Sequence, residues 1–173
     1  MKNLNKIILA CAVLIVAGCS NAGRFGNDAN GANSGALDGA ASDPRSAAYF
    51  QETVGDRVLF VVDQSSQTPE GRAPLDAQAN WLNTITDYNA LIEGHADEQG
   101  TRDYNLALGG RRANAVQEYL VSRGVAENRL RIVTYGKERP LEICSEEACY
   151  AKNRRAVTVV SARSEARRVR KER

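Results

Sequence analysis

Apolar residues in the middle of the chain follow two periods, one typical of strands and one typical of helices. Four short runs predict strands over residues 58–62, 90–94, 130–135 and 156–160, and the first of them is rich in β-branched residues. The first run is apolar at every position, as in a strand covered on both faces, so we expect it at the centre of the sheet.

Two longer segments between these runs have helical spacing. The first begins with Thr68 as N-cap and Pro69 at the first helical position, and predicts a helix to about residue 86. The second begins near Arg102, after Thr101 as cap, and ends at Gly124. Because parallel strands need long crossovers, this order predicts an α/β fold of the α+β type. We expect a two-layer sandwich with a small mixed four-stranded sheet and helices on one face.

The N-terminal residues predict export. Lys2 and Lys6 precede an apolar run of eleven residues, 7–17, which is too short to cross the ~30 Å hydrocarbon core but has the length of a secretory h-region. The run ends in Val-Ala-Gly-Cys at residues 16–19, which resembles the lipobox of bacterial lipoproteins. That resemblance implies a signal peptide over residues 1–18 and lipidation of Cys19. Ser20 implies sorting to the outer membrane, where acyl chains would anchor the protein.

Composition divides the rest of the chain into three parts. Residues 19–46 are almost entirely Gly, Ala, Asn, Ser and Asp, cannot bury enough apolar area to fold, and predict a flexible tether. Residues 47–161 form the predicted domain. Residues 162–173 form a basic tail, which we expect to be solvated.

Charge and composition exclude several classes of function. Of the 23 basic residues, 2 precede Cys19 and 6 follow Ala162, which leaves 15 against 19 acidic residues in the stretch between. This is not the basic surface of a nucleic-acid-binding domain. One His and four Cys exclude a multi-histidine metal site, and we expect no cofactor.

The cysteines fall into two groups. Cys11 would leave with the signal peptide and Cys19 would carry lipid. Cys144 and Cys149 would then remain in an oxidising compartment, where a disulfide is the default. A zinc half-site is the alternative, but no second pair of ligands stands near these two cysteines.

Three neighbouring motifs carry a resemblance. They read Glu-Gly-His-Ala-Asp-Glu-Gln-Gly-Thr at residues 93–101, Tyr-Asn-Leu-Ala-Leu at 104–108 and Arg-Arg-Ala-Asn-Ala-Val at 111–116. Together they resemble the signature of OmpA-like peptidoglycan-binding domains. The first motif, with Tyr-Gly-Lys-Glu at 135–138 and Asn-Arg-Arg-Ala-Val at 153–157, points more narrowly to the peptidoglycan-associated lipoproteins of that family. The resemblance covers about residues 57–160 and implies the fold of the OmpA C-terminal domain.

The resemblance also implies a ligand, the diaminopimelate residue of peptidoglycan stem peptides. Its side chain ends in an ammonium and a carboxylate on one carbon, so a binder needs a fixed anion and a fixed cation. Asp97 matches the position that pairs with the ammonium. Arg112 matches the position whose guanidinium receives the carboxylate bidentately.

Four more residues match the family's site. Asn105 lies two helical turns before Arg112 and is expected to hold the loop or the ligand. Val62 and Asp63 are expected to line the pocket, by backbone and by side chain respectively, and Arg154 is a further candidate for ligand contact. By contrast, Arg111 is expected to meet solvent or an acidic neighbour.

The family's role implies a non-enzymatic protein that tethers the outer membrane to the cell wall. It implies membership of the Tol-Pal system, with a part in envelope integrity and in constriction at cell division, and docking to TolB in competition with peptidoglycan. Two alternatives stay open: a peptidoglycan hydrolase that uses His95, Asp97 and Glu93 or Glu98, and an envelope interaction module that does not bind glycan. The carboxylates lie in a polar loop without a nucleophile or metal set, which disfavours the hydrolase.

Two local features carry expectations of their own. The single His95 is expected to be a hydrogen-bonding loop residue. Gly109 and Gly110 fall inside the second predicted helix, where each glycine costs about 1 kcal/mol relative to alanine, so we expect a looser turn there.

Overall fold

The computed structural model describes residues 41–163. The predicted signal peptide, Cys19, most of the tether and most of the basic tail lie outside the described residues. Within the described range, no helix combines the length and the apolar character that crossing a bilayer requires.

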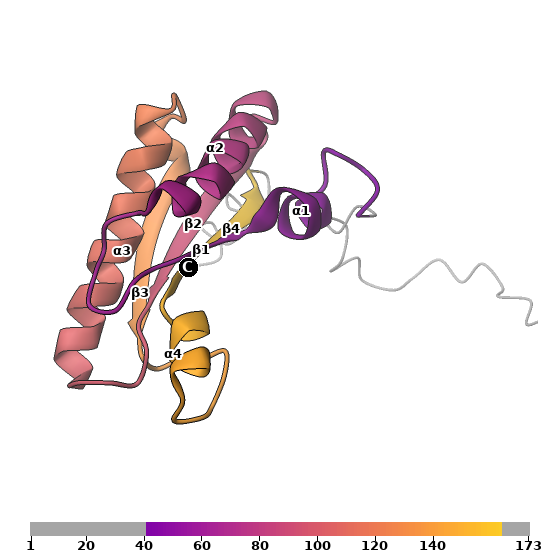
Figure 1. Cartoon of the computed structure of the whole chain (residues 1–173). Helices are drawn as coiled ribbons and strands as arrows, with labels where there is room; N and C mark the ends of the chain where they lie inside the picture. The colour runs from indigo at the N-terminus through magenta and orange to yellow at the C-terminus, as the bar shows by residue number, and fades with distance from the viewer. Residues whose placement is uncertain (1–40, 164–173) are drawn as a thin grey trace, which may run out of the picture. The chain divides into compact units, whose positions relative to one another are not determined.

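The domain is built on a mixed four-stranded sheet in the order β1-β4-β2-β3 (Figure 1). The strands are β1 (Arg57–Leu59), β2 (Tyr88–His95), β3 (Leu130–Gly136) and β4 (Arg155–Ala162). β2 pairs in parallel with β3, and β4 runs antiparallel to both of its neighbours. Helices α2 (Pro69–Thr84) and α3 (Arg102–Ser122) cover one face. The predicted fold class is therefore confirmed.

Both long helices begin at the predicted caps. The hydroxyl oxygen of Thr68 accepts from the Gly71 N–H at 3.1 Å, and that of Thr101 accepts from the Tyr104 N–H at 3.2 Å. Gly124, at φ +94°, follows the end of α3 in the left-handed conformation that favours glycine.

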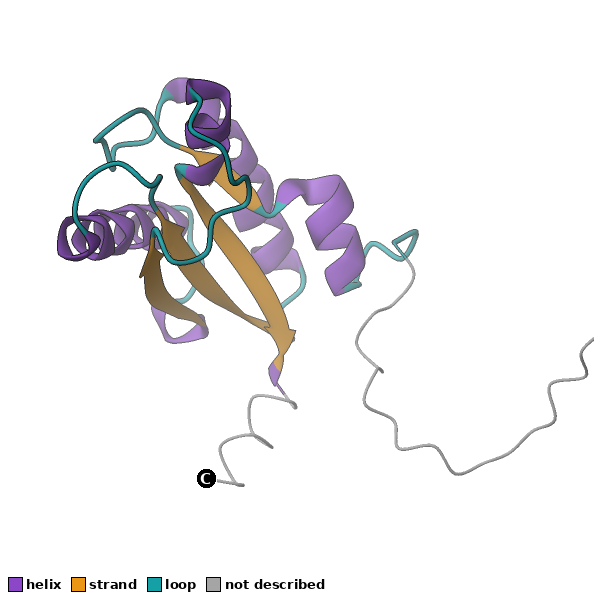
Figure 2. Cartoon of the chain, turned by 90° about the horizontal axis from the view of Figure 1, so that it is seen from below, coloured by secondary structure: helices purple, strands orange, loops and turns teal. Residues whose placement is uncertain are grey.

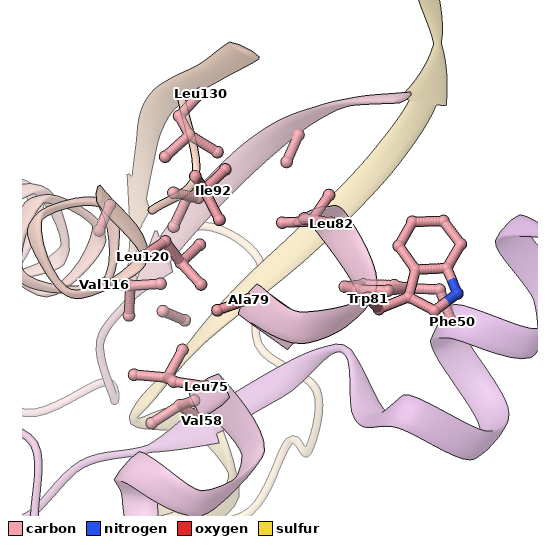
Figure 3. Close-up of a cluster of buried hydrophobic side chains, with 14 of the residues drawn as sticks. Phe50, Val58, Leu75, Ala79, Trp81, Leu82, Ile92, Val116, Leu120 and Leu130 are labelled. Atoms are coloured by element: carbon pink, nitrogen blue, oxygen red, sulfur yellow. The ribbon is translucent and has the colours of Figure 1, made fainter. Parts of the chain in front are cut away.

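The hydrophobic core lies between the sheet and the two long helices (Figure 3). Its labelled members are Phe50, Val58, Leu75, Ala79, Trp81, Leu82, Ile92, Val116, Leu120 and Leu130. The ring of Phe50 lies 4.9 Å from that of Trp81. Phe50 belongs to a short helix that the sequence analysis did not predict, which begins as α1 (Ala47–Tyr49) and continues as a π-helical segment, Phe50–Gly55.

The prediction for the first strand was wrong in place and length. β1 covers only Arg57–Leu59 and is an edge strand that pairs with β4 alone. Val61 and Val62 are 45% and 46% exposed. The chain leaves the sheet after Phe60 and turns, and Asp63 takes the left-handed conformation at φ +60°. An apolar run by itself does not distinguish a buried strand from a strand followed by an exposed turn.

Gly109 has a packing role that the sequence did not reveal. A Cβ on Gly109 would lie 2.5 Å from Thr134 Oγ1, and a Cβ on Gly94 would lie 1.8 Å from the Gly109 carbonyl oxygen. The pair thus lets α3 approach β2 and β3 closely. At Gly110 a Cβ would meet nothing nearer than 4.0 Å.

The candidate residues gather at one end of the sheet. β2 and β3 finish there and β4 starts there, beside the short helix α4 (Glu147–Asn153), which the sequence analysis also missed. α4 is at the bottom of Figure 1, and Figure 2, the view from that end, shows several loops in front of the strands.

Candidate functional site

Asp97 and Arg112 converge although fifteen residues separate them. Asp97 lies in the loop after β2 and Arg112 lies in the middle of α3; they are 7% and 0% exposed. Arg112 Nη1 donates to the carbonyl of His95, two residues before Asp97, at 2.8 Å. The Asp97 carboxylate also acts electrostatically on the Arg112 guanidinium. The loop therefore folds back onto the helix that follows it.

The direct partner of Asp97 is Arg154. Arg154 Nη1 lies 3.1 Å from Asp97 Oδ2, and the two side chains are 6% and 10% exposed. A second nitrogen of Arg154 donates to Glu147 on α4, and its Nε donates to the Phe60 carbonyl at 3.2 Å. Burial lowers the pKa of Arg154, but the hydrogen bonds to Glu147 and Asp97 outweigh that effect and raise it. Arg154 is thus a fixed cation between two carboxylates.

The Arg112 guanidinium is enclosed by backbone carbonyls. Its guanidinium donates to three backbone carbonyls, those of His95, Gln64 at 2.8 Å and Val61 at 3.2 Å. Burial lowers the pKa of Arg112 to about 10, and Asp97 works in the opposite direction. Arg112 is still a cation at neutral pH. Its hydrogen bonds to Gln64 and Val61 hold the loop after β1 in place.

The Val61–Gln64 turn covers Arg112. Its ends are joined by a hydrogen bond from the Gln64 N–H to the Val61 carbonyl at 3.2 Å. Asp63 is the only non-glycine residue at positive φ within the described range, in a conformation that Asp tolerates better than most residues. Its carboxylate is exposed and accepts a hydrogen bond from the Tyr104 hydroxyl on α3. Val62 and Asp63 therefore lie on the turn beside the guanidinium, but on its exposed side.

Asn105, on α3, is hydrogen-bonded to the loop after β2. Its side-chain amide donates to the carbonyls of Asp97 at 3.2 Å and Gln99 at 2.8 Å. The side chain is buried, and its Oδ1 has no hydrogen-bond partner in the described part of the chain. Of the two roles expected for Asn105, the structure assigns the loop contact, and it leaves one buried acceptor beside Asp97.

His95 is not the loop residue that the sequence predicted. It is the last residue of β2, is 2% exposed, and neither ring nitrogen has a hydrogen-bond partner among residues 41–163. Burial, helped by the charges of Arg155 and Arg139, lowers its pKa to about 4. The ring is neutral at pH 7, so the 3.7 Å approach of Glu93 is not an ion pair. Separately, Arg111 is exposed as expected and lies over the Tyr104 ring.

A disulfide-closed loop forms the outer wall. Cys144 and Cys149 are joined, and the segment between them carries Glu147, the partner of Arg154. The Ser145 and Tyr150 hydroxyls donate to Glu98 at 3.3 Å and 2.9 Å. Sequence reasoning missed Glu147, Tyr150 and the role of Glu98. The signal available was that the two cysteines stand within ten residues of Arg154.

Acid–base or metal chemistry finds little support here. Asp97 is engaged by Arg154, and Glu98 by two hydroxyls. Among the described residues no group of His, Cys, Asp and Glu is arranged to hold a metal ion. What the site offers is a buried anion next to two buried cations, which suits a small zwitterion.

Comparison with known proteins gives matches over most of the chain. Residues 59–155 match the model of the OmpA family. A protein named peptidoglycan-associated lipoprotein from Rhizobium meliloti is 49% identical over 157 residues, which is 90% of this chain and 88% of the relative. One of the same name from Pseudomonas aeruginosa is 44% identical, over 85% of this chain and 90% of the relative.

Solved structures give the same result. The crystal structure of the peptidoglycan-associated lipoprotein from Burkholderia pseudomallei matches with a TM-score of 0.62 at 36% identity, over 70% of this chain and 98% of that one. The C-terminal domain of Helicobacter pylori MotB matches with a TM-score of 0.59 at 18% identity, over 67% of this chain and 92% of that one. The second likeness concerns the fold alone.

Proposed function

The chain belongs to the OmpA family, among the peptidoglycan-associated lipoproteins, and from this premise we propose that it binds the diaminopimelate residue of stem peptides without forming a covalent bond. Membership places it in the cell envelope, in association with peptidoglycan, and agrees with the expectation of a protein that is not an enzyme. The ligand, the anchor and the partners are the proposed part.

One observation carries the proposal: a buried carboxylate stands beside two buried guanidinium groups. Diaminopimelate presents an ammonium and a carboxylate on one carbon, so it needs opposite charges a few ångströms apart. Asp97 supplies the anion, and Arg154 lies 3.1 Å from it. Asp97 is near enough to act electrostatically on the Arg112 guanidinium, and its charge partly offsets the lowering of the Arg112 pKa by burial. The unpartnered Oδ1 of Asn105 offers a second acceptor for the ammonium.

Binding to Arg112 requires the Val61–Gln64 turn to yield. Two of the three carbonyls on the guanidinium, those of Val61 and Gln64, belong to this turn. A ligand carboxylate would replace these neutral acceptors with a bidentate, charge-assisted pair, and such hydrogen bonds are roughly twice as strong. The exposed positions of Val62 and Asp63 leave the turn free to move without disturbing the core.

The anchor and the partners complete the proposal. Acyl chains on Cys19 would hold the protein in the outer membrane, and residues 19–46 would let the domain reach the cell wall. The resemblance to the family supports TolB and other Tol-system proteins as partners, with TolB and peptidoglycan competing. The role would be to link the outer membrane to the wall, also during constriction at division.

Two matched peptides test the ligand. Isothermal titration would compare a stem tripeptide that contains diaminopimelate with the same tripeptide containing lysine, which keeps the ammonium but lacks the carboxylate. We expect the lysine peptide to bind at least about tenfold more weakly, a difference of about 1.4 kcal/mol. Equal affinities would contradict the proposal. Fragments released from purified sacculi would favour the hydrolase instead.

A further inference from the structure

We propose that the loop closed by Cys144–Cys149 is a positioning element of the diaminopimelate site and that the disulfide raises ligand affinity. This inference rests on the proposed function. The two cysteines are five residues apart in the sequence. Three hydrogen bonds connect this segment to Arg154 and to Glu98, the residue after Asp97. They involve Ser145 and Glu147, within the loop, and Tyr150, the residue after Cys149.

The first contact fixes a cation. Glu147, between the two cysteines, accepts a hydrogen bond from Arg154, whose other end donates to Asp97. The Glu147 side chain is 66% exposed, whereas that of Arg154 is 6% exposed. The buried guanidinium is therefore shared between an outer and an inner carboxylate, and the outer one is placed by the cystine.

The other two contacts hold the residue next to Asp97. Both hydroxyls, of Ser145 and Tyr150, converge on one carboxylate oxygen of Glu98. The hydrogen bond to Glu98 raises the pKa of Tyr150, which keeps its hydroxyl a donor. Glu98 is adjacent in sequence to Asp97, so the closed loop restrains the position of the ligand-binding carboxylate.

The start of α4 needs this closure. The helix has seven residues, and its N-cap, Glu146, makes no side-chain capping bond. A helix this short is not stable by itself. Its far end is anchored separately, because the Asn153 side chain accepts from the N–H groups of Leu141 and Glu142 and donates to the Glu142 carbonyl. Opening the disulfide would therefore loosen the first turn of α4, which carries Glu147, and leave Asn153 in place.

Charge balance gives the direction of the effect. With Glu147 in place, Arg154 is shared between two carboxylates, and Asp97 keeps part of its acceptor capacity for the ligand ammonium. Without Glu147, the local charge becomes more positive by one unit, and Asp97 is left as the acid that is hydrogen-bonded to Arg154. The added positive charge disfavours the ligand ammonium, and Asp97 is held more fully by Arg154. The affinity should fall.

The test compares five forms of the full chain, each titrated with the diaminopimelate tripeptide. They are the oxidised protein, the protein reduced with a water-soluble phosphine, Glu147→Gln in its oxidised and reduced forms, and Glu146→Gln. Reduction adds two electrons and two protons to the cystine and gives two thiols, while the phosphine becomes its oxide with oxygen from water. Glu146→Gln is the matched control, because it removes an adjacent exposed acid whose side chain makes no capping bond.

We expect reduction and Glu147→Gln each to weaken binding of the tripeptide roughly threefold to tenfold. This is the size of effect expected from losing one partly exposed ion pair and loosening the loop that carries it. Reduction of Glu147→Gln should add little, and Glu146→Gln should bind like the parent. NMR signals of core methyl groups should stay unchanged, which separates positioning from unfolding. Equal affinity of the oxidised and reduced forms would overturn this inference alone. Failure of the oxidised protein to bind would overturn the proposed function as well.

Discussion

The carboxylate of Asp97 and the guanidinium of Arg154 lie 3.1 Å apart, both almost fully buried, at the end of the sheet where β2 finishes and β4 starts. Arg112 approaches the same carboxylate from α3. Removing any member of this set leaves a buried charge without its counterpart, which is costly.

Asp97→Asn and Arg112→Lys should each lower retention on purified sacculi at least about tenfold, and the double variant should lose little more. Asp97→Asn removes the anion that would pair with the ligand ammonium, and Arg112→Lys removes the planar fork that would bind the ligand carboxylate bidentately. Arg111→Lys, at the exposed neighbouring position, is the control and should bind normally. Two additive losses in a co-sedimentation assay would argue against one shared pocket.

Tyr104→Phe should raise the affinity for the diaminopimelate tripeptide about two- to fivefold. The substitution removes the hydroxyl that donates to Asp63 and so weakens the hold on the turn over Arg112, while it keeps the ring beneath Arg111. This hydrogen bond is exposed to solvent and contributes little net free energy, so the expected gain is small. Titration calorimetry checks it, and a loss of affinity would mean that the turn does not have to move.

Gly109→Ala should destabilise the domain by about 1–3 kcal/mol, because its Cβ would lie 2.5 Å from Thr134 Oγ1. Gly110→Ala, one position later, would bring its Cβ no nearer than 4.0 Å to a neighbour and should be neutral or stabilising by up to about 1 kcal/mol. Urea unfolding of the two variants gives the comparison. Similar urea midpoints for the two variants would mean that α3 does not pack as closely on the sheet at Gly109 as the structure has it.

His95 should make the protein less stable as the pH falls from about 6.5 to 4. The folded state keeps the ring neutral, with its pKa lowered to about 4 by burial and by Arg155 and Arg139, while the unfolded chain takes up a proton near pH 6.5. The free energy of unfolding therefore falls with decreasing pH across this window, by at most about 1.4 kcal/mol per pH unit from this group. His95→Gln should have a flatter profile in urea titrations at several pH values. Parallel profiles would contradict the assignment.

Arg129→Met should cost about 2–4 kcal/mol of stability. The Arg129 guanidinium is buried and donates to the carbonyls of Leu82, Ile85 and Tyr88, which joins the end of α2 to the start of β2. Without it, buried carbonyls lose their donor. Arg131→Met, at an exposed position of β3, is the control and should change the thermal midpoint little. Equal shifts would show that the three carbonyls do not depend on Arg129.

Much of the fold could be predicted because its signals are local. Thr68 and Thr101 are N-caps, and each one bonds the backbone N–H only three residues later, so both helix starts can be read from a short stretch of sequence. The helical spacing after them identifies the faces that pack on the sheet. The edge position of β1 is not local. It depends on the pairing of β1 with β4, about a hundred residues later, so the apolar run at 58–62 was misplaced. The short helices were missed because a core contact of Phe50, or a disulfide, completes each of them.

The sequence could name residues that gather at this end of the sheet, but not how they pair. The motif resemblance supplied Asp97, Arg112, Asn105 and Arg154. It could not say that Asp97 contacts Arg154 directly, because that contact depends on where β4 enters the sheet. Nor could it say that carbonyls of the Val61–Gln64 turn enclose Arg112. Both facts come from backbone geometry, which side-chain patterns do not encode.

The most direct measurement is an NMR titration of the arginine Nε–H signals with the diaminopimelate tripeptide. Arg129 serves as an internal control, because it is buried against carbonyls at the opposite end of β2. We predict saturable shifts for the signals of Arg112 and Arg154, which Asp97→Asn should abolish, and an unchanged Arg129 signal. If the tripeptide binds and the signals of Arg112 and Arg154 do not move, the diaminopimelate site proposed around these two arginines is contradicted.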